Sequence, residues 1–516
     1  MKIVVRQDGE KREIEAAAGT TLLEALRSAG MPIEAPCGGN GTCKKCRVLV
    51  RDDTGVSYRL ACQTPARAGM EVTLQKNRAM EVSTAGAGRW WEPDVGAGYG
   101  VAVDVGTTTV VCRLYDRATG ALLASAGNSN AQIVFGADVI TRIKAADDGH
   151  LEEMRSLIAD EVESLIATLC QRVGVRRADV GEIVLAGNTT MEHIAAGLDP
   201  HGIGVAPFSP VTLFGKREPF LGGSAYFAPC VAGYVGGDIT CGLLAVDMLA
   251  ERDPVLFMDL GTNGEMALGD ASGIVSCATA AGPVFEGSNV RFGMPAYPGA
   301  ISGVRYEDGL MRLQVIGGED PVGICGTGLI DAVALLLDVG VVDETGRMLG
   351  ADEVAIADEG AQEGTGVPSD GGCPRALADR IFELDGRPAF RLAGDIAVTQ
   401  EDVRNLQLAK AAVAGGIETL LARRGIGAGD VAKLQIAGGF GQFLDMRNAA
   451  RVGLFPTALL DWATGVGNTS IEGASAVLLS ATARAELRRI VERCSYIELS
   501  GDPTFDECYL DAMEFE

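Results

Sequence analysis

The sequence is short of histidine, short of positive charge and without any long uninterrupted hydrophobic run. Its three histidines, His150, His193 and His201, are too scattered to form a metal centre, and we assign them to structure or solvent contact. A formal net charge of −25 argues against nucleic acid or anionic lipid as a partner. The most apolar stretch, GLIDAVALLLDVGVV, is interrupted by Asp331 and Asp338, which argues against a membrane helix.

Two sequence signals are also missing. The beginning of the chain, MKIVVRQDGEKREIE, is charged where a signal peptide needs an apolar run, so we expect a cytoplasmic protein with no membrane partner. No G-x4-G-K-[ST] motif occurs, so a nucleotide would not be bound through a P-loop. The 516 residues suffice for about three domains, at roughly 100 to 200 residues each.

Thirteen cysteines are present, and four of them fall in one short segment. Cys37, Cys43 and Cys46 lie in APCGGNGTCKKCRVLV, and Cys62 follows in RLACQT. Their spacing, C-x5-C-x2-C-x15-C, resembles that of the plant-type [2Fe-2S] ferredoxin family, with one additional residue in the first gap. Glycines in this loop would let the backbone approach the cluster closely. The other cysteines are scattered, as buried thiols of a reducing cytosol would be: Cys112, Cys170, Cys230, Cys241, Cys277, Cys325, Cys373, Cys494 and Cys508.

A zinc knot and two disulfides are the competing interpretations of the four cysteines. Zinc sites usually combine two C-x2-C pairs, whereas this segment has one, and disulfides do not suit an acidic cytosolic protein. The surrounding pattern predicts a β-grasp domain over residues 1–76. Its expected elements are a strand KIVVR, a turn at Asp8-Gly9, a strand KREIE, a helix TTLLEALRSAG ended by Gly30, and strands in CRVLVRD and MEVTLQ.

Residues 77–99 lose this periodicity and gain glycine, alanine and proline, which predicts a linker. The linker contains two adjacent tryptophans, Trp90 and Trp91. They would either anchor it on the neighbouring domain or contact a partner protein, because indole rings bury a large apolar area.

An internal duplication opens the remaining segment, residues 100–516. GVAVDVGTTTVVCRLYD and VLFMDLGTNGEMAL both combine a strand, a D-x-G-T turn and a second strand, and their aspartates, Asp104 and Asp259, are 155 residues apart. Two such turns can present backbone N–H groups and hydroxyls to a triphosphate from opposite sides, while the carboxylates hold hydrated Mg²⁺.

A third motif, KLQIAGGFGQFLD, delivers Gly438 and Gly439 from a strand to the start of a helix, where a purine and its ribose can lie against the backbone. Strand-to-helix elements are expected in EIVLAGNTTMEHIAAGL and GVGNTSIEGASAVLLS, and a long capped helix begins near Thr399. The predicted ATP and Mg²⁺ residues are Asp104, Gly106, Thr107, Thr108, Asp259, Gly261, Thr262, Asn263, Gly438, Gly439 and Phe440.

The order of these motifs resembles the superfamily of acetate and sugar kinases, heat-shock chaperones and actin. Together with the N-terminal cysteines, the motifs GNTTM, DLGTNGE, AGPVFEG, CGTGLIDAVA, IAGGFG and GNTSIEGA are similar to those of reductive activators of corrinoid-dependent enzymes. The resemblance implies an α+β multidomain chain: a β-grasp [2Fe-2S] ferredoxin domain, then a duplicated, two-lobed α/β actin-like ATPase domain. It also implies ATP-dependent transfer of one electron to cobalt(II) of a corrinoid protein, giving the cobalt(I) needed for methyl transfer.

Three carboxylates are candidates for a catalytic role. Glu265 follows the second turn where related phosphatases place the glutamate that orients water, and its alternative is a structural hydrogen bond. Asp238 in VGGDIT and Glu286 in AGPVFEG would hold magnesium-bound water or cap a helix. Activators of this kind often carry an additional domain after the linker, whereas here the first turn follows within a few residues. If that domain helps to dock the corrinoid partner, docking in this protein must be arranged differently.

The resemblance implies a corrinoid protein as partner, an external flavoprotein or ferredoxin as electron donor, and a homodimer. Three alternatives stay open from the sequence: an ATP-dependent electron donor to another low-potential enzyme, a small-molecule kinase with a redox regulatory domain, and a chaperone-like ATPase that inserts the corrinoid. The first of these is associated with a [4Fe-4S] cluster, which the cysteine spacing does not suit.

Overall fold

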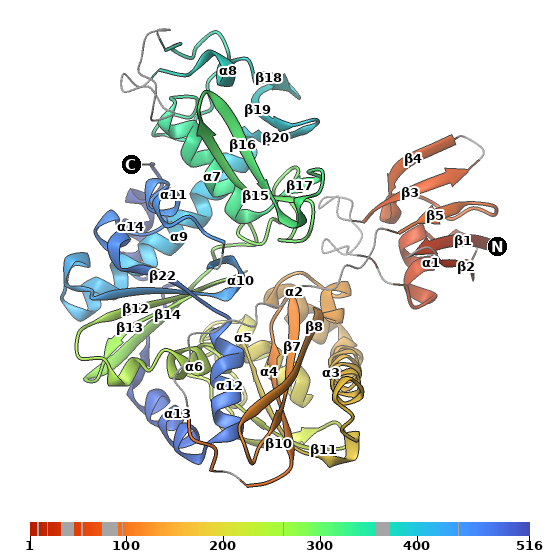
Figure 1. Cartoon of the computed structure of the whole chain (residues 1–516), viewed down its shortest axis with the longest axis vertical. Helices are drawn as coiled ribbons and strands as arrows, with labels where there is room; N and C mark the ends of the chain where they lie inside the picture. The colour runs from red at the N-terminus through yellow and green to blue at the C-terminus, as the bar shows by residue number, and fades with distance from the viewer. Residues whose placement is uncertain are drawn as a thin grey trace.

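The computed structural model describes residues 1–7, 10–17, 19–31, 33, 46–52, 55–74, 91–94, 96–261, 263–357, 372–441 and 443–515. The N-terminal domain is a five-stranded sheet in the order β2-β1-β5-β3-β4 with one helix against it (Figure 1). Its elements are β1 (Lys2–Gln7), β2 (Glu10–Glu15), α1 (Leu22–Ser28), β3 (Arg47–Asp52), β4 (Gly55–Leu60) and β5 (Glu71–Thr73).

This domain confirms the predicted β-grasp arrangement. Helix α1 begins at a capping box in which Thr21 accepts from the amide of Glu24, and it buries Leu22 and Leu26 against the sheet. Strand β4 was not predicted, and the Asp8-Gly9 turn lies outside the described residues.

The first lobe contains a six-stranded sheet in the order β10-β11-β9-β6-β7-β8. Its strands are β6 (Tyr99–Val105), β7 (Thr109–Asp116), β8 (Ala121–Ser129), β9 (Val180–Gly187), β10 (Lys216–Phe220) and β11 (Gly223–Phe227). Its helices are α2 (Val139–Ala145), α3 (Leu151–Val173), α4 (Thr189–Ala196), α5 (His201–Gly204) and α6 (Gly237–Ala245). Helix α3 covers one face of the sheet through an apolar stripe that includes Ile158, Leu165 and Leu169.

The second lobe repeats this sheet. Its order is β22-β21-β12-β13-β14-β23, and in both sheets one strand pairs antiparallel with its successor and parallel with a later strand, β6 with β7 and β9, and β12 with β13 and β21. The strands are β12 (Val255–Leu260), β13 (Gly264–Asp270), β14 (Gly273–Thr279), β21 (Lys433–Ala437), β22 (Ala463–Gly467) and β23 (Cys494–Tyr496). The predicted duplication is therefore a duplication of structure.

Two three-stranded sheets extend the second lobe. They contain β15 (Ala300–Glu307), β16 (Leu310–Val315), β17 (Gly323–Ile324), β18 (Ile381–Leu384), β19 (Arg387–Ala393) and β20 (Ile396–Thr399). The helices are α7 (Gly326–Asp338), α8 (Arg375–Ala378), α9 (Gln400–Arg424), α10 (Gly438–Gly441), α11 (Met446–Arg451), α12 (Thr469–Leu479), α13 (Ala481–Arg493) and α14 (Pro503–Asp511). Helix α9 starts at the predicted Thr399 capping box.

Helix α12 lies beside the first lobe although it follows strand β22 of the second lobe (Figure 1). On its lobe-facing side, Glu472 forms an ion pair with Arg113 of β7 at 2.8 Å, and the arginine is almost fully buried. Helix α12 also packs closely against α6, because Gly473 and Gly242 leave no side chain between the two backbones. These two helices therefore join the lobes.

No helix in the described part of the chain is both long and apolar enough to cross a membrane.

Candidate functional site: a cavity between two duplicated turns

The first turn joins β6 to β7 and is stabilised by one internal hydrogen bond and by two from neighbouring side chains. The amide of Gly106 donates to the carbonyl of Thr109 at 2.9 Å, and Asn130 Nδ2 donates to the carbonyl of Gly106 at 2.8 Å. The buried guanidinium of Arg142 donates to the carbonyl of Thr107 at 2.5 Å. Because these carbonyls are occupied, the backbone of the turn is fixed in one conformation.

Asp104, at the end of β6, is held by the beginning of α12. Asn468 Nδ2 and Ser470 Oγ each donate to one of its carboxylate oxygens at 2.8 Å. Burial raises the pKa of Asp104, whereas these two hydrogen bonds oppose that rise because they favour the ionised form. Its carboxylate is therefore oriented by a helix that belongs to the other half of the chain.

The second turn joins β12 to β13, as the first joins β6 to β7, but its backbone hydrogen bond spans one residue fewer. The amide of Gly261 donates to the carbonyl of Asn263 at 3.0 Å, and Asp259 lies opposite Glu265 in the antiparallel pair. Thr262, at the tip, lies outside the described residues. Both turns thus place an aspartate at the end of a buried strand and a short backbone loop beyond it.

The glycines after β21 allow a close approach to the second turn. Gly438 has φ of +87°, and a Cβ atom there would lie 2.8 Å from Asp259 Oδ1, so a side chain would be strained and would clash. Phe440 follows on α10, and its ring packs against Phe285 with centroids 5.0 Å apart.

A cavity of about 280 Å³ lies where these elements meet. Every predicted ATP, Mg²⁺ and catalytic residue that the structure describes lines it. The lining residues from the prediction are Asp104, Gly106, Thr107, Thr108, Asp238, Asp259, Gly261, Asn263, Glu265, Glu286, Gly438, Gly439 and Phe440. The sequence motifs are therefore brought together from both lobes around one space.

The cavity is strongly acidic. No lysine or arginine is among the described residues that line it. Burial, with repulsion from Asp104 and Glu286, raises the pKa of Asp259 to about 7. Burial, with repulsion from Asp259, raises the pKa of Asp238 to about 8, and burial raises that of Glu265 well above its usual range. Such a site favours protons or a divalent cation and would repel a bare triphosphate.

A cation in this cavity would need ligands beyond the protein. Within the described residues, no three histidine, cysteine, aspartate or glutamate side chains are arranged to hold a metal ion. Mg²⁺ keeps several waters and commonly shares one or two carboxylates with substrate phosphates. The donors of the cavity fit that pattern.

The three predicted catalytic carboxylates differ in their contacts. Glu286 accepts from Thr108 Oγ1 at 3.0 Å and so connects the first turn to the second lobe. Asp238 accepts from the amide of Ile239 at 2.8 Å in the first turn of α6, where the N-cap residue is Gly236. Glu265 is nearly fully buried at the cavity wall. Asp238 is thus not the N-cap that one prediction allowed.

Residues that sequence reasoning missed support the first turn. Asn188 and Asn468 occupy the same place in the motifs GNTT and GNTS, and each caps the helix that follows. Asn188 Nδ2 donates to Thr107 Oγ1 at 3.0 Å, as Asn468 donates to Asp104. The repetition of the motif was a usable signal, whereas nothing in the sequence around Arg142 pointed to the cavity.

The cysteine site is described in part. The sulfurs of Cys46 and Cys62 are buried and lie 3.2 Å apart, as two thiolates converging on one cluster would. Cys37 and Cys43 lie outside the described residues. The converging pair fits an iron-sulfur ligand set, although two sulfurs alone do not distinguish it from a zinc site.

Comparison with protein families decides between an iron-sulfur cluster and a zinc site. Residues 5–67 match the 2Fe-2S iron-sulfur cluster binding domain, and residues 99–251 match the RACo middle region. Residues 253–371 and 374–516, more than half of the chain, match the C-terminal domain of RACo, the ASKHA domain. The chain belongs to the RACo family. Both the predicted [2Fe-2S] domain and the actin-like domain are thereby confirmed.

Relatives of this RACo protein carry names that describe corrinoid chemistry. It is 29% identical to the corrinoid activation enzyme RamQ of Eubacterium limosum over 97% of each chain. It is 25% identical to the [Co(II) methylated amine-specific corrinoid protein] reductase of Methanosarcina barkeri, over 56% of this chain and 51% of the relative. A solved structure described as a reductive activator for corrinoid, iron-sulfur protein is 30% identical, covers 100% of this chain and 98% of its own, and has a TM-score of 0.69.

The RACo middle-region match covers the first lobe, including the first turn. Strand β6 begins at Tyr99, where that match also begins, and no further domain separates β5 from β6 among the described residues. In this chain the segment that matches the RACo middle region is therefore the first lobe of the two-lobed unit.

Proposed function

We propose that this RACo protein reductively activates a corrinoid protein, using ATP to drive one electron from a [2Fe-2S] cluster to cobalt(II) and so regenerate cobalt(I). The observation that carries the proposal is the union, in one chain of this family, of an iron-sulfur domain with a cavity built from two duplicated turns. An electron carrier alone needs no nucleotide, and a kinase alone needs no cluster.

The redox chemistry gives the reason for this union. When bound, the cluster supplies single electrons, and plant-type [2Fe-2S] centres have potentials of about −400 mV. The cobalt(II)/cobalt(I) couple of a base-off corrinoid, the substrate here, is lower. Each 100 mV uphill costs about 2.3 kcal/mol per electron. Binding of ATP would stabilise a closed state that prefers the reduced partner, which supplies the difference.

The residues of the cavity would divide the work on ATP. Asp104 and Asp259 would hold hydrated Mg²⁺ together with phosphate oxygens, and the two turns at residues 106–108 and 261–263 would donate backbone amides to the phosphates. Gly438, Gly439 and Phe440 would carry the adenosine. Glu265 would orient the attacking water, with Asp238 and Glu286 next to the cation.

The remaining partners follow from the same scheme. An external flavoprotein or ferredoxin would reduce the cluster between turnovers, and the activator would act as a homodimer through its ASKHA domain. The buried cysteines outside the cluster are free thiols in the described part of the chain, which favours a reducing cytoplasmic setting.

Anaerobic visible spectroscopy tests the proposal. The chemically reduced protein is mixed with a cobalt(II) corrinoid methyltransferase subunit, with and without ATP and Mg²⁺. We expect the separate absorption band of cobalt(I) to appear only when both ATP and Mg²⁺ are present. If no corrinoid partner from a panel yields cobalt(I), the electron goes to another acceptor and the proposal is wrong.

A further inference from the structure

Helix α12 begins at the nucleotide cavity. Its N-cap residue, Asn468, and Ser470 in its first turn hold the two oxygens of Asp104, each at 2.8 Å. Any ligand that moves or recharges this carboxylate therefore acts on the beginning of α12. The helix is one straight element of 11 residues, which corresponds to about 16 Å at 1.5 Å per residue.

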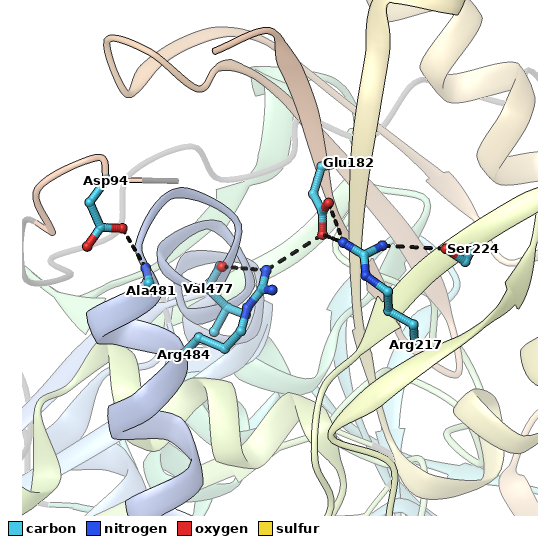
Figure 2. A network of polar contacts seen from close by, with 7 residues as sticks. All are labelled: Asp94, Glu182, Arg217, Ser224, Val477, Ala481 and Arg484. Carbon is cyan, nitrogen blue, oxygen red and sulfur yellow. Dashed lines mark hydrogen bonds and ion pairs between the residues drawn. The ribbon is translucent and has the colours of Figure 1, made fainter. Parts of the chain in front are cut away.

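The other end of α12 meets the segment that leads from the iron-sulfur domain. Asp94 accepts from the amide of Ala481 at 2.6 Å (Figure 2). The amide of Asp94 donates to the carbonyl of Leu479 at 3.2 Å. Ser480 and Thr482 add weaker hydroxyl contacts to the same carboxylate, each at 3.5 Å. An acidic group at the start of α13 is also favoured by the helix dipole.

Trp91 strengthens this attachment. Its side chain is buried in the same hydrophobic cluster as Leu478 and Leu479 of α12. This confirms, for Trp91, the prediction that the tryptophan pair anchors the linker, while Trp90 lies outside the described residues. The last part of the predicted linker is therefore docked on the corner between α12 and α13.

The corner itself is locked to the first lobe. Arg484 of α13 donates to the carbonyl of Val477 at 3.2 Å and lies 3.6 Å from a carboxylate oxygen of Glu182 on β9 (Figure 2). Arg217 of β10 holds the same carboxylate at 2.7 and 2.5 Å. These contacts hold the corner against α12 and β9, so that the corner does not move independently of the helix.

We propose that α12 transmits the nucleotide state to the tether of the iron-sulfur domain, and that Asp94 is the positioning residue that receives it. Close packing of Gly473 against the backbone of Cys241 prevents α12 from bending or sliding freely on α6. A change at Asp104 would therefore reach the far end of α12, where Asp94 and Trp91 attach the segment that leads from the iron-sulfur domain. The consequence for electron transfer rests on the proposed function, but the mechanical coupling does not.

Tryptophan fluorescence tests the coupling without a corrinoid. The chain has three tryptophans, so the variant W90F/W462F leaves Trp91 as the sole emitter. We expect Mg²⁺ and ATP to shift its emission, and Asp94→Ala introduced into the same background to remove most of that shift. Asp94→Asn, which keeps one acceptor oxygen, should restore part of it. The matched control is Glu92→Ala, because Glu92 is an exposed carboxylate two residues earlier and should leave the shift unchanged.

The cobalt assay supplies the second measurement. In otherwise native protein, Asp94→Ala should leave ATP affinity unchanged and lower the ATP-dependent rate of cobalt(I) formation by about tenfold, the effect of losing one strong charge-assisted contact. The coupling is wrong if the emission spectrum of Trp91 does not change on addition of ATP. It is also wrong if the Asp94→Ala protein forms cobalt(I) at the native rate. If the native protein forms no cobalt(I) while Trp91 still responds to ATP, the proposed function fails and the coupling stands.

Discussion

At the scale of single residues, Arg142 is the clearest case of a group that works from outside the cavity. It is fully buried, and it donates to the carbonyls of Thr107 and Gly136, to Gln132 and to the sulfur of Met191. Burial lowers its pKa to about 9, so the guanidinium stays charged at neutral pH. It is thus a fixed positive charge directly beneath the first turn.

We expect Arg142→Met to weaken ATP binding by about tenfold, or 1.4 kcal/mol, because the turn loses its fixed conformation and the acidic site loses a positive charge that acts on Glu286. It should also lower the free energy of unfolding by about 3 kcal/mol, because buried carbonyls lose their donor. Calorimetric titration and urea unfolding measure the two effects. The control Arg176→Met removes an exposed pair with Asp179 and should change neither. Native ATP affinity in a folded Arg142→Met protein would contradict this role.

The raised pKa values of the cavity predict a pH dependence. The pKa of Asp259 is about 7 and that of Asp238 about 8, so both carboxyl groups lose their protons as the pH rises through this range. A cation needs the ionised forms, so the affinity for Mg²⁺ and ATP should increase between about pH 6 and about pH 8.5. Asp259→Asn should flatten this increase, whereas Asp395→Asn, at an exposed turn between β19 and β20, should not. An affinity that falls with pH in the native protein would refute the argument.

The same shifts predict the opposite trend for the protein without nucleotide. In the folded state these two carboxyl groups keep their protons to higher pH than in the unfolded state, which has the ordinary pKa. The folded state therefore binds more protons between about pH 4 and about pH 8, and stability falls as the pH rises through this window. Urea unfolding measures the free energy of unfolding with and without Mg²⁺ and ATP. The stabilisation that the ligands give should become smaller as the pH is lowered.

At the scale of elements, the two lobes are joined through the contact between helices α6 and α12. A Cβ atom on Gly473 would lie 2.0 Å from the carbonyl oxygen of Cys241, which is far inside normal contact. Gly473→Ala should therefore push the helices apart and cost about 1–3 kcal/mol of stability, as overpacked cores do. Gly429→Ala, at an exposed position where a Cβ atom meets nothing, is the matched control for urea unfolding. Equal midpoints for both variants would show that the junction is not tightly packed.

Sequence reasoning reached the elements whose signals are local. The N-terminal helix, the capping box at Thr399, the two D-x-G-T turns and the glycines that begin α10 were all found because a few neighbouring residues decide them. Strand β4 was missed although GVSYRL alternates apolar and polar residues, a local strand signal that the structure bears out by its pairing with β3. Arg142 was missed because its role depends on how α2 packs against the first turn and Met191. The attachment of Asp94 was missed because its partner Ala481 lies 387 residues later in the sequence.

At the scale of the whole molecule, the chain combines two units with different chemistry. The sulfurs of Cys46 and Cys62 lie in a small domain that has its own five-stranded sheet. The acidic cavity lies between the two lobes. Because the hydrophobic cluster of the small domain contains no residue of the lobes, each unit can be disabled without unfolding the other. This separation makes the division of labour open to direct test.

We expect Cys62→Ser and Asp259→Ala to have opposite effects. Cys62→Ser removes a proposed ligand of the cluster, so cobalt(I) formation should be abolished while ATP binds with native affinity. Asp259→Ala removes the carboxylate that we propose as a cation ligand, so ATP-dependent reduction should be lost while the visible and paramagnetic spectra of the reduced cluster are unchanged. Calorimetry, spectroscopy and the cobalt assay on both proteins give the four results. Loss of both functions in either folded variant would mean that cluster and cavity are parts of one site, and the separation argued from the two cores would be wrong.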